Sequence, residues 1–239
     1  MPPMPSIKEL ERLQTSKQLV GYFGYGSLVN RATLRTEVVA AIPARLKGWH
    51  RTWRARPVMD HDAAVAAAAA PALAAAGLTP SLLSAHPAPK DRPQAGIDGL
   101  LVIDLVDNLP HIDAREFRYH RRDISLGDLE FSSSVSMEGA DIAPYSGISL
   151  HVYEARTEHP HETGHSPILR SYLDAVMQGF LREFGEEGVH RFVTETDAFH
   201  TPIHEDRHEA LYPRAVSLSP AEIELFDAAL GRRLRPAGN

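Results

Sequence analysis

The sequence predicts a single mixed α/β domain built on a partly antiparallel sheet or barrel. Strand and helix patterns are interspersed along the 239 residues without a regular βαβ repeat. The run Gly96–Leu105 is apolar and bounded by turn residues, which is typical of a buried strand. The segment Ser166–Gly185 is the clearest helix, with Ser166 as N-cap, Pro167 in the first position and Gly185 as C-cap. One face of it is apolar: Ile168, Tyr172, Leu173, Val176, Met177, Phe180 and Leu181.

Composition favours a small-molecule ligand over a polymer. Apolar residues make up 43% of the chain, which is enough for a full core. A net charge of -6 gives no electrostatic reason to expect nucleic acid or an anionic membrane as partner. The absence of cysteine excludes disulfides and thiolate chemistry. The first residues lack the apolar core of a signal peptide and no run of about 18 apolar residues occurs, so we expect a cytoplasmic protein.

The first part of the chain predicts a helix, a strand and a hairpin. Residues 1–18 are expected to form an N-terminal helical extension, since Ser6 and Glu9 have the spacing of a capping box. A strand follows from Leu19. Aromatic and basic residues nearly alternate around Gly48 in the segment Ile42–Arg56, which indicates a strand or hairpin.

An alanine-rich segment, Ala63–Leu78, interrupts the pattern. Alanine favours helix, but the segment has few large side chains to pack and contains Pro71. We therefore expect a surface insertion, placed at residues 60–92.

The remaining elements follow local signals. Asn108–Glu116 predicts a short helix, with Pro110 near its first turn, where the missing N–H costs nothing. Strands are expected at Tyr119–Leu126 and Ile148–Arg156, and a last helix from Ser219 to about Leu234. Residues 19–185 would then form the main domain, and residues 186–239 a C-terminal extension packed on it.

The first predicted strand ends abruptly in Gly24-Tyr25-Gly26-Ser27. Two glycines around one tyrosine let the backbone turn sharply and approach another group closely. The turn is therefore a candidate binding element.

Glu116 is a candidate acid–base residue. Leu109, Ile112 and Glu116 share one face of the predicted short helix, whereas Asp113 and Arg115 fall on other faces and can reach solvent. A carboxylate turned inward costs free energy unless it is paired, and desolvation raises its pKa. The alternative is that Glu116 simply pairs with Arg121 or Arg122.

Four segments together resemble the γ-glutamylcyclotransferase superfamily. They are "YFGYGSL" at Tyr22–Leu28, "ARLKGWHRTW" at Ala44–Trp53, "GIDGLLV" at Gly96–Val102 and "IDAREFRYHR" at Ile112–Arg121. The helix from Ser166 is similar to the C-terminal helix of that family. The resemblance covers roughly residues 19–185.

The resemblance implies an α+β fold with a small mixed β-barrel flanked by helices. It implies intramolecular attack of an α-amine on a γ-glutamyl amide, releasing 5-oxoproline and an amine or amino acid without a cofactor or metal. Glu116 would be the acid–base residue. The substrate would be bound by the turn Tyr25, Gly26, Ser27 and Leu28, and the pocket lined by Tyr119 and Tyr153. Ser27 is not expected to be a nucleophile, since the Gly-x-Ser-x-Gly pattern is absent.

Other features leave the substrate open. The segment after the turn departs from the glutathione-specific branch of the family, so glutathione is not the expected substrate. The segment Glu195–Val216 extends beyond the family core, as a lid or as a packed surface extension. Histidines 200, 204 and 208 recur every four residues, and 159, 161 and 165 cluster, but Pro202 argues against a helix that would align the first three as metal ligands.

Three functions fit these observations: a cyclotransferase, a non-catalytic small-ligand binding or regulatory protein on the same fold, and an enzyme that removes a γ-glutamyl group from a larger intermediate.

Overall fold

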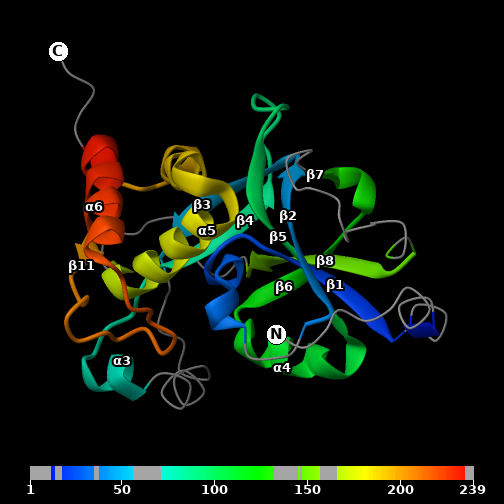
Figure 1. The fold of residues 1–239 in the computed structure, drawn as a ribbon, viewed down its shortest axis with the longest axis horizontal. Helices are drawn as coiled ribbons and strands as arrows, with labels where there is room; N and C mark the ends of the chain where they lie inside the picture. The colour runs from blue at the N-terminus through cyan, green and yellow to red at the C-terminus, as the bar shows by residue number, and fades with distance from the viewer. Residues whose placement is uncertain are drawn as a thin grey trace.

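The computed structural model describes residues 12–13, 18–34, 38–55, 71–131, 145, 147–156 and 166–234 (Figure 1). A six-stranded sheet has the order β6-β8-β1-β5-β2-β7, a three-stranded sheet the order β10-β3-β4, and β11 pairs with β9. The strand bounds are β1 Leu19–Gly24, β2 Ala40–Lys47, β3 Trp49–Arg54, β4 Leu82–Pro87, β5 Gly96–Leu105, β6 Tyr119–Ile124, β7 Leu129–Phe131, β8 Ser149–Ala155, β9 Ile168–Leu169, β10 Thr196–Asp197 and β11 Ile203–His204. The helices are α3 Pro71–Ala75, α4 Leu109–Arg115, α5 Arg170–Glu195 and α6 Pro220–Leu234, with short 3-10 turns at Ser27–Val29, Arg31–Thr33, Val106–Asn108 and Leu126–Asp128.

The α+β class is confirmed, whereas a closed barrel is not. Within the described ranges, β6 and β7 are the outer strands of the six-stranded sheet and do not pair with each other. Of the predicted N-terminal helix, only Arg12 and Leu13 are described, and both are helical. Its capping box lies outside the described residues. None of the described helices is long and apolar enough to cross a membrane.

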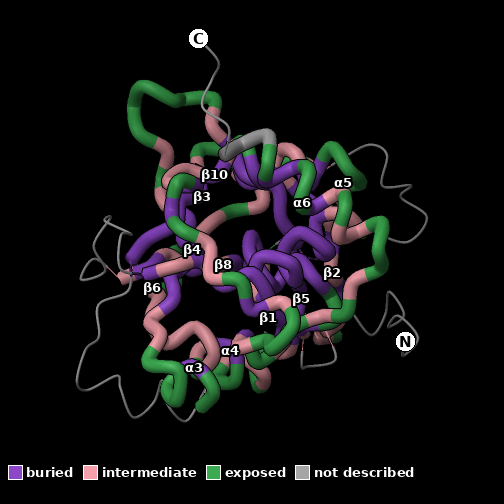
Figure 2. Tube along the Cα trace, turned by 90° about the vertical axis from the view of Figure 1, so that its left-hand side faces the viewer, coloured by how far each residue is buried: buried purple, intermediate pink, exposed green. Residues whose placement is uncertain are grey.

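Strand β5 is the centre of the core, as its apolar pattern predicts. It lies antiparallel between β1 and β2, and nine of its ten residues are buried (Figure 2). Its two buried aspartates are paired. Asp98 contacts Arg45 at 2.9 Å and Arg191 at 2.6 Å, and Asp104 accepts a hydrogen bond from Asn108 at 2.7 Å. Polar side chains inside a strand are tolerated here because each has a partner.

The predicted strand or hairpin at residues 42–56 is two strands that belong to different sheets. Gly48 between them has φ +71°, a backbone conformation that favours glycine. β2 pairs with β5 and β7, whereas β3 pairs with β4 and β10. The chain therefore crosses from one sheet to the other at Gly48.

The predicted insertion at residues 60–92 is wrong for part of its length. Strand β4 pairs with β3 over six residues, and Leu82, Leu83, Ser84 and Ala85 are buried. The alanine-rich composition misled the prediction because β4 follows it directly. Residues 56–70 lie outside the described residues.

The long helix differs from its prediction at both ends. Ser166 and Pro167 precede the helix, because Ile168 and Leu169 form β9 and pair with β11; α5 begins at Arg170. Gly185, the predicted C-cap, has φ +66° and interrupts the helical backbone, but helical residues resume to Glu195.

The apolar face of α5 is buried, and the opposite side is covered by the C-terminal segment. There α6 lies beside α5 (Figure 1), and the Gln178 amide donates to Ser217 O at 3.0 Å.

The start of α6 agrees with its capping pattern. The Ser219 N–H donates to Glu222 Oε2 at 2.7 Å, and the Glu222 N–H donates to Ser219 Oγ at 3.2 Å. This reciprocal pair satisfies two of the free donors at a helix N-terminus.

Gly179 lets α5 approach the segment that follows the first turn, and it provides a test of this packing. A Cβ at Gly179 would lie 2.6 Å from Asn30 N and 2.8 Å from Asn30 Cα, both backbone atoms. We expect Gly179→Ala to lower the free energy of unfolding by about 1–3 kcal/mol, the usual cost of overpacking. Urea denaturation followed by circular dichroism measures it.

Gly231→Ala is the matched control, since a Cβ there meets nothing within 4 Å in α6. Alanine should stabilise this helix by about 0.5–1 kcal/mol. Equal effects of the two substitutions would contradict the close approach of α5.

Candidate active site

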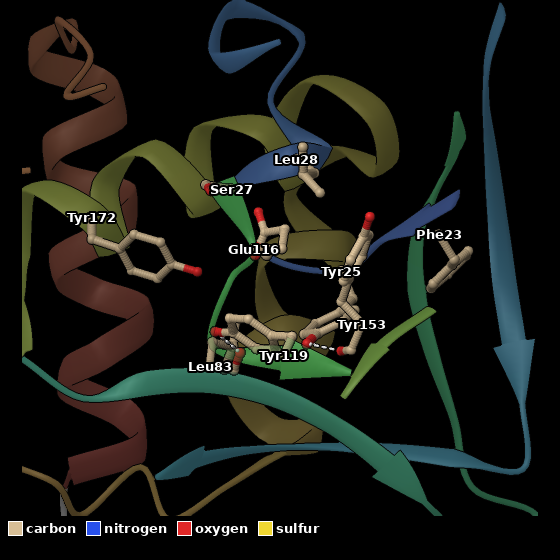
Figure 3. Close-up of a pocket in the computed structure, with 10 residues that line it drawn as sticks. Phe23, Tyr25, Ser27, Leu28, Leu83, Glu116, Tyr119, Tyr153 and Tyr172 are labelled. Carbon is tan, nitrogen blue, oxygen red and sulfur yellow. Dashed lines mark hydrogen bonds between the residues drawn. The ribbon is translucent and has the colours of Figure 1, made fainter. Parts of the chain in front are cut away.

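The structure brings all seven predicted site residues together around one cavity. The empty space between the lining residues, open solvent included, is about 320 Å³. In Figure 3, Glu116 lies between the turn residues Ser27 and Leu28 on one side and Tyr119 and Tyr153 on the other. The lining residues are Phe23, Tyr25, Gly26, Ser27, Leu28, Leu83, Glu116, Tyr119, Tyr153 and Tyr172.

The turn after β1 is closely packed against its surroundings. A Cβ at Gly24 would lie 2.5 Å from Leu28 Cβ, and one at Gly26 would lie 2.8 Å from the Tyr172 hydroxyl. In the part of the chain that the structure describes, no backbone carbonyl accepts from the N–H groups of Gly26, Ser27 or Leu28. The glycines therefore allow a close approach to the cavity wall. The Ser27 N–H faces the Tyr172 hydroxyl there, whereas the N–H groups of Gly26 and Leu28 have no described backbone acceptor.

A buried arginine supports this turn from behind. Arg51 Nη1 donates to the carbonyl oxygens of Tyr25 at 3.1 Å and Asp98 at 3.3 Å, and its Nε donates to Thr196 Oγ1 at 2.9 Å. Its guanidinium lies 5.0 Å from the ring centroid of Phe180 and 4.6 Å from that of Phe192. Burial lowers the pKa of Arg51 to about 10, so the side chain remains a cation at neutral pH.

Glu116 faces the cavity, but for a different reason from the one predicted. Helix α4 ends at Arg115, and Glu116 is its C-cap with φ -100° and ψ 28°, outside the helical range. Its position therefore does not follow from the helical face shared with Leu109 and Ile112. The capping conformation turns its side chain inward, where 16% of it is exposed.

Arg115 was predicted to reach solvent and instead joins the site. Its Nε lies 3.0 Å from Glu116 Oε1, its Nη2 donates to Ser27 Oγ at 2.9 Å, and its Nη1 donates to Thr33 O at 3.1 Å. The alternative pairing of Glu116 with Arg121 or Arg122 is wrong, because Arg121 contacts Asp113 and Arg122 contacts Glu154. One guanidinium thus links the candidate base to the turn.

Burial controls the protonation of Glu116. Desolvation raises the pKa of its carboxyl, and the charges of Arg115 and Arg214 oppose that rise without cancelling it. A carboxyl of raised pKa in a cavity is a candidate proton donor and acceptor.

The predicted pocket tyrosines turn their hydroxyls to protein acceptors. Tyr119 donates to Leu83 O at 2.9 Å, Tyr153 to Asp113 Oδ1 at 2.9 Å, and Tyr25 to the Tyr153 carbonyl. Burial raises the pKa of Tyr25 and Tyr153, so both stay neutral. The rings of Tyr119 and Tyr153, fixed by these bonds, form the wall opposite Ser27 and Leu28 (Figure 3).

Phe23, Leu83 and Tyr172 were missed as site residues. Leu83 lies in the segment interpreted as an insertion, Phe23 in the predicted first strand, and Tyr172 on the apolar face of the predicted long helix. Tyr172 lies edge-on to Trp53 and Tyr212, with ring centroids 6.0 and 5.0 Å apart. A polar tip on an apolar helix face is the signal that could have identified Tyr172.

The histidine pattern does not form a metal site in the described parts of the chain. No group of three or more His, Asp or Glu residues there is placed to hold a metal ion. His204 is in β11, and no helix aligns it with His200 and His208. His159, His161 and His165 lie outside the described residues.

The raised pKa of Glu116 predicts a pH-dependent stability difference. The folded state favours the protonated acid, so ionisation of Glu116 destabilises the fold as pH rises above the ordinary carboxyl range, until the raised pKa is passed. Glu116→Gln cannot ionise. We therefore expect the free energy of unfolding of this variant, relative to the parent, to increase with pH and then level off.

Urea titrations of both proteins between pH 4 and 8 would measure this difference. For Glu130→Gln, at an exposed position of β7, the difference from the parent in free energy of unfolding should change much less with pH. A Glu116→Gln difference that falls with pH would show that the carboxyl is not desolvated.

Comparison with known proteins finds similarity of fold only. No protein-family model matches the chain, and no curated protein matches it. Among solved structures, a gamma-glutamyl cyclotransferase is 12% identical, with 88% of this chain and 99% of that chain covered and a TM-score of 0.49. An uncharacterized protein from Homo sapiens gives the same values. A yeast gamma-glutamyl cyclotransferase specific to glutathione is 12% identical over 90% of this chain and 97% of that chain, with a TM-score of 0.43. The structural neighbours thus include gamma-glutamyl cyclotransferases, at low sequence identity.

Proposed function

We propose that the protein is an enzyme of the γ-glutamylcyclotransferase type. The observation that carries this proposal is the position of Glu116, a buried carboxyl of raised pKa, across a small cavity from backbone N–H donors. The resemblance of the turn and of the segment Ile112–Arg121 to that family supports it.

The reaction needs few groups because both reacting atoms belong to one molecule. The α-amine of the γ-glutamyl substrate attacks its own γ-carbonyl carbon, a five-membered lactam forms, and the amide C–N bond breaks. Glu116 accepts a proton from the α-ammonium, which frees the nitrogen lone pair, and returns a proton to the departing nitrogen. The products are 5-oxoproline and an amine or amino acid. No cofactor takes part.

The turn would stabilise charge on the substrate. The N–H groups of Gly26 and Leu28, which no described backbone carbonyl accepts, would bind the developing oxyanion or the glutamyl carboxylate, and one such donor is typically worth about 3 kcal/mol in the transition state. The Ser27 N–H already faces the Tyr172 hydroxyl. Arg115 contacts both Glu116 and Ser27, so the base and the donors keep a fixed distance. Tyr119 and Tyr153 would enclose the bent substrate.

One observation favours a non-catalytic binding protein instead. The ion pair with Arg115 engages Glu116 at 3.0 Å, and a permanently paired carboxylate is a poor base. Turnover therefore decides between the two functions.

A panel of γ-glutamyl amino acids, peptides and amines, with 5-oxoproline measured by mass spectrometry, tests the proposal. We expect the parent to release 5-oxoproline and Glu116→Gln to be slower by about 100- to 10,000-fold, the usual contribution of a general acid–base. Glu130→Gln should retain full activity. Substrate binding by the parent without any 5-oxoproline would favour the binding protein.

Ser27→Ala separates a binding turn from a nucleophile. Ser27 Oγ accepts from Arg115, and no histidine lines the cavity. We expect kcat to fall by less than about tenfold, since one hydrogen bond is lost while the backbone donors remain. A loss as large as that of Glu116→Gln, or a mass adduct on Ser27, would indicate a covalent mechanism.

A further inference from the structure

Arg214, in the C-terminal extension, does not line the cavity but is linked to a residue that does. Its Nε donates to the Tyr212 hydroxyl at 3.0 Å, and its guanidinium lies 5.1 Å from the centroid of that ring. Tyr212 is buried and contacts Tyr172 edge-on at 89°, and Tyr172 lines the cavity (Figure 3). The rings of Tyr212 and Tyr172, which contact each other, thus connect Arg214 to the cavity wall.

The segment that carries Arg214 is fixed to the start of α5. The buried Asp206 carboxylate accepts from the Ser171 N–H at 2.8 Å, from the Ser171 hydroxyl, and from the Leu211 N–H at 2.9 Å. The Tyr212 N–H donates in turn to Ser171 Oγ at 3.2 Å. These bonds hold the Tyr212 ring and therefore the guanidinium stacked on it.

Arg214 is a positioned cation without a counter-ion. Among the described residues, no carboxylate lies within ion-pair distance of it, and its two terminal nitrogens donate to no protein acceptor. Arg115, the other arginine of the site, is already engaged by Glu116, Ser27 and Thr33. Arg214 is nevertheless close enough to lower the pKa of Glu116 through its charge. An unpaired guanidinium held in one place suits a planar anion that binds through two oxygens.

We propose that Arg214 forms a carboxylate subsite for the part of the substrate beyond the γ-glutamyl group. This inference rests on the proposed function. In this proposal the cavity beside Glu116 takes the glutamyl part, and Arg214, which does not line that cavity, meets the substituents of the departing amino group. The substrate class is then a γ-glutamyl amino acid or peptide with a free carboxylate, in preference to a γ-glutamyl amine.

A pair of substrates of equal size isolates this contact: γ-glutamylalanine and γ-glutamylalaninamide, which differ only in the terminal charge. We expect the parent to prefer the acid in kcat/KM by about 10- to 100-fold, the value of hydrogen bonds to a charged group. In Arg214→Ala the preference should fall to near unity, and Arg214→Lys should restore part of it. Arg92→Ala removes a surface cation that pairs with Asp197 and should leave the preference unchanged.

The ratio of kcat/KM for the acid to kcat/KM for the amide is insensitive to the effect of Arg214 on Glu116, because that effect changes both rates alike. An equal loss for acid and amide in Arg214→Ala, or no preference in the parent, would overturn the subsite.

Failure of the proposed function is distinguishable from failure of the subsite. If the parent turns over neither compound, calorimetric binding of both to the parent and to Arg214→Ala decides. If Arg214→Ala binds the acid more weakly than the parent does, the result supports the subsite in a non-catalytic protein. Equal binding of the acid to both proteins, or none to the parent, overturns it.

Discussion

The arrangement of the site depends on one buried cation, Arg51. Its guanidinium binds the Tyr25 carbonyl in the turn, the Asp98 carbonyl in β5 and the Thr196 hydroxyl in β10. Removing a guanidinium from water costs several kcal/mol unless its donors are satisfied. The Nη2 of Arg51 already has no partner among the described residues, so loss of a further acceptor would add to that cost. No carboxylate within the described residues contacts Arg51 directly, and two phenylalanine rings face it instead. The conformation of the turn is therefore tied to the packing of both larger sheets and not only to its glycines.

Elements with local signals could be predicted from the sequence, whereas elements defined by distant partners could not. β5, α4 and α6 follow from an apolar run, a proline in the first turn and a capping pattern, all within a few residues. β4 exists because β3 is available to pair with it, and α5 begins late because β9 pairs with a strand 35 residues further on. The sequence predicts a strand or hairpin around Gly48, but which sheet each flanking strand joins is a tertiary property.

The candidate site also divides into residues that local sequence motifs identify and residues whose roles depend on distant partners. The resemblance located seven residues that all line the cavity, because motifs keep the order of the segments that build it. The face argument for Glu116 reached an inward carboxyl through an incorrect helix length. It placed Arg115 in solvent, whereas the long side chain at the end of α4 reaches Ser27 and Thr33. Tyr172 carries one local signal, a polar tip on an apolar helix face, whereas Arg214 carries none. Their roles depend on the C-terminal segment that Asp206 fixes to α5.

The ion pair of Glu116 is compatible with acid–base chemistry because burial outweighs it. Had attraction to Arg115 dominated, the pKa of Glu116 would be depressed and the carboxylate would be a weak base; instead, its pKa is raised. Arg115 keeps its bonds to Ser27 and Thr33 whichever protonation state Glu116 adopts, since neither acceptor titrates near neutral pH. Protonation of Glu116 can thus weaken one contact of the guanidinium while its other two hold it against the turn. The arrangement lets a proton move without displacing the donors that would face the substrate.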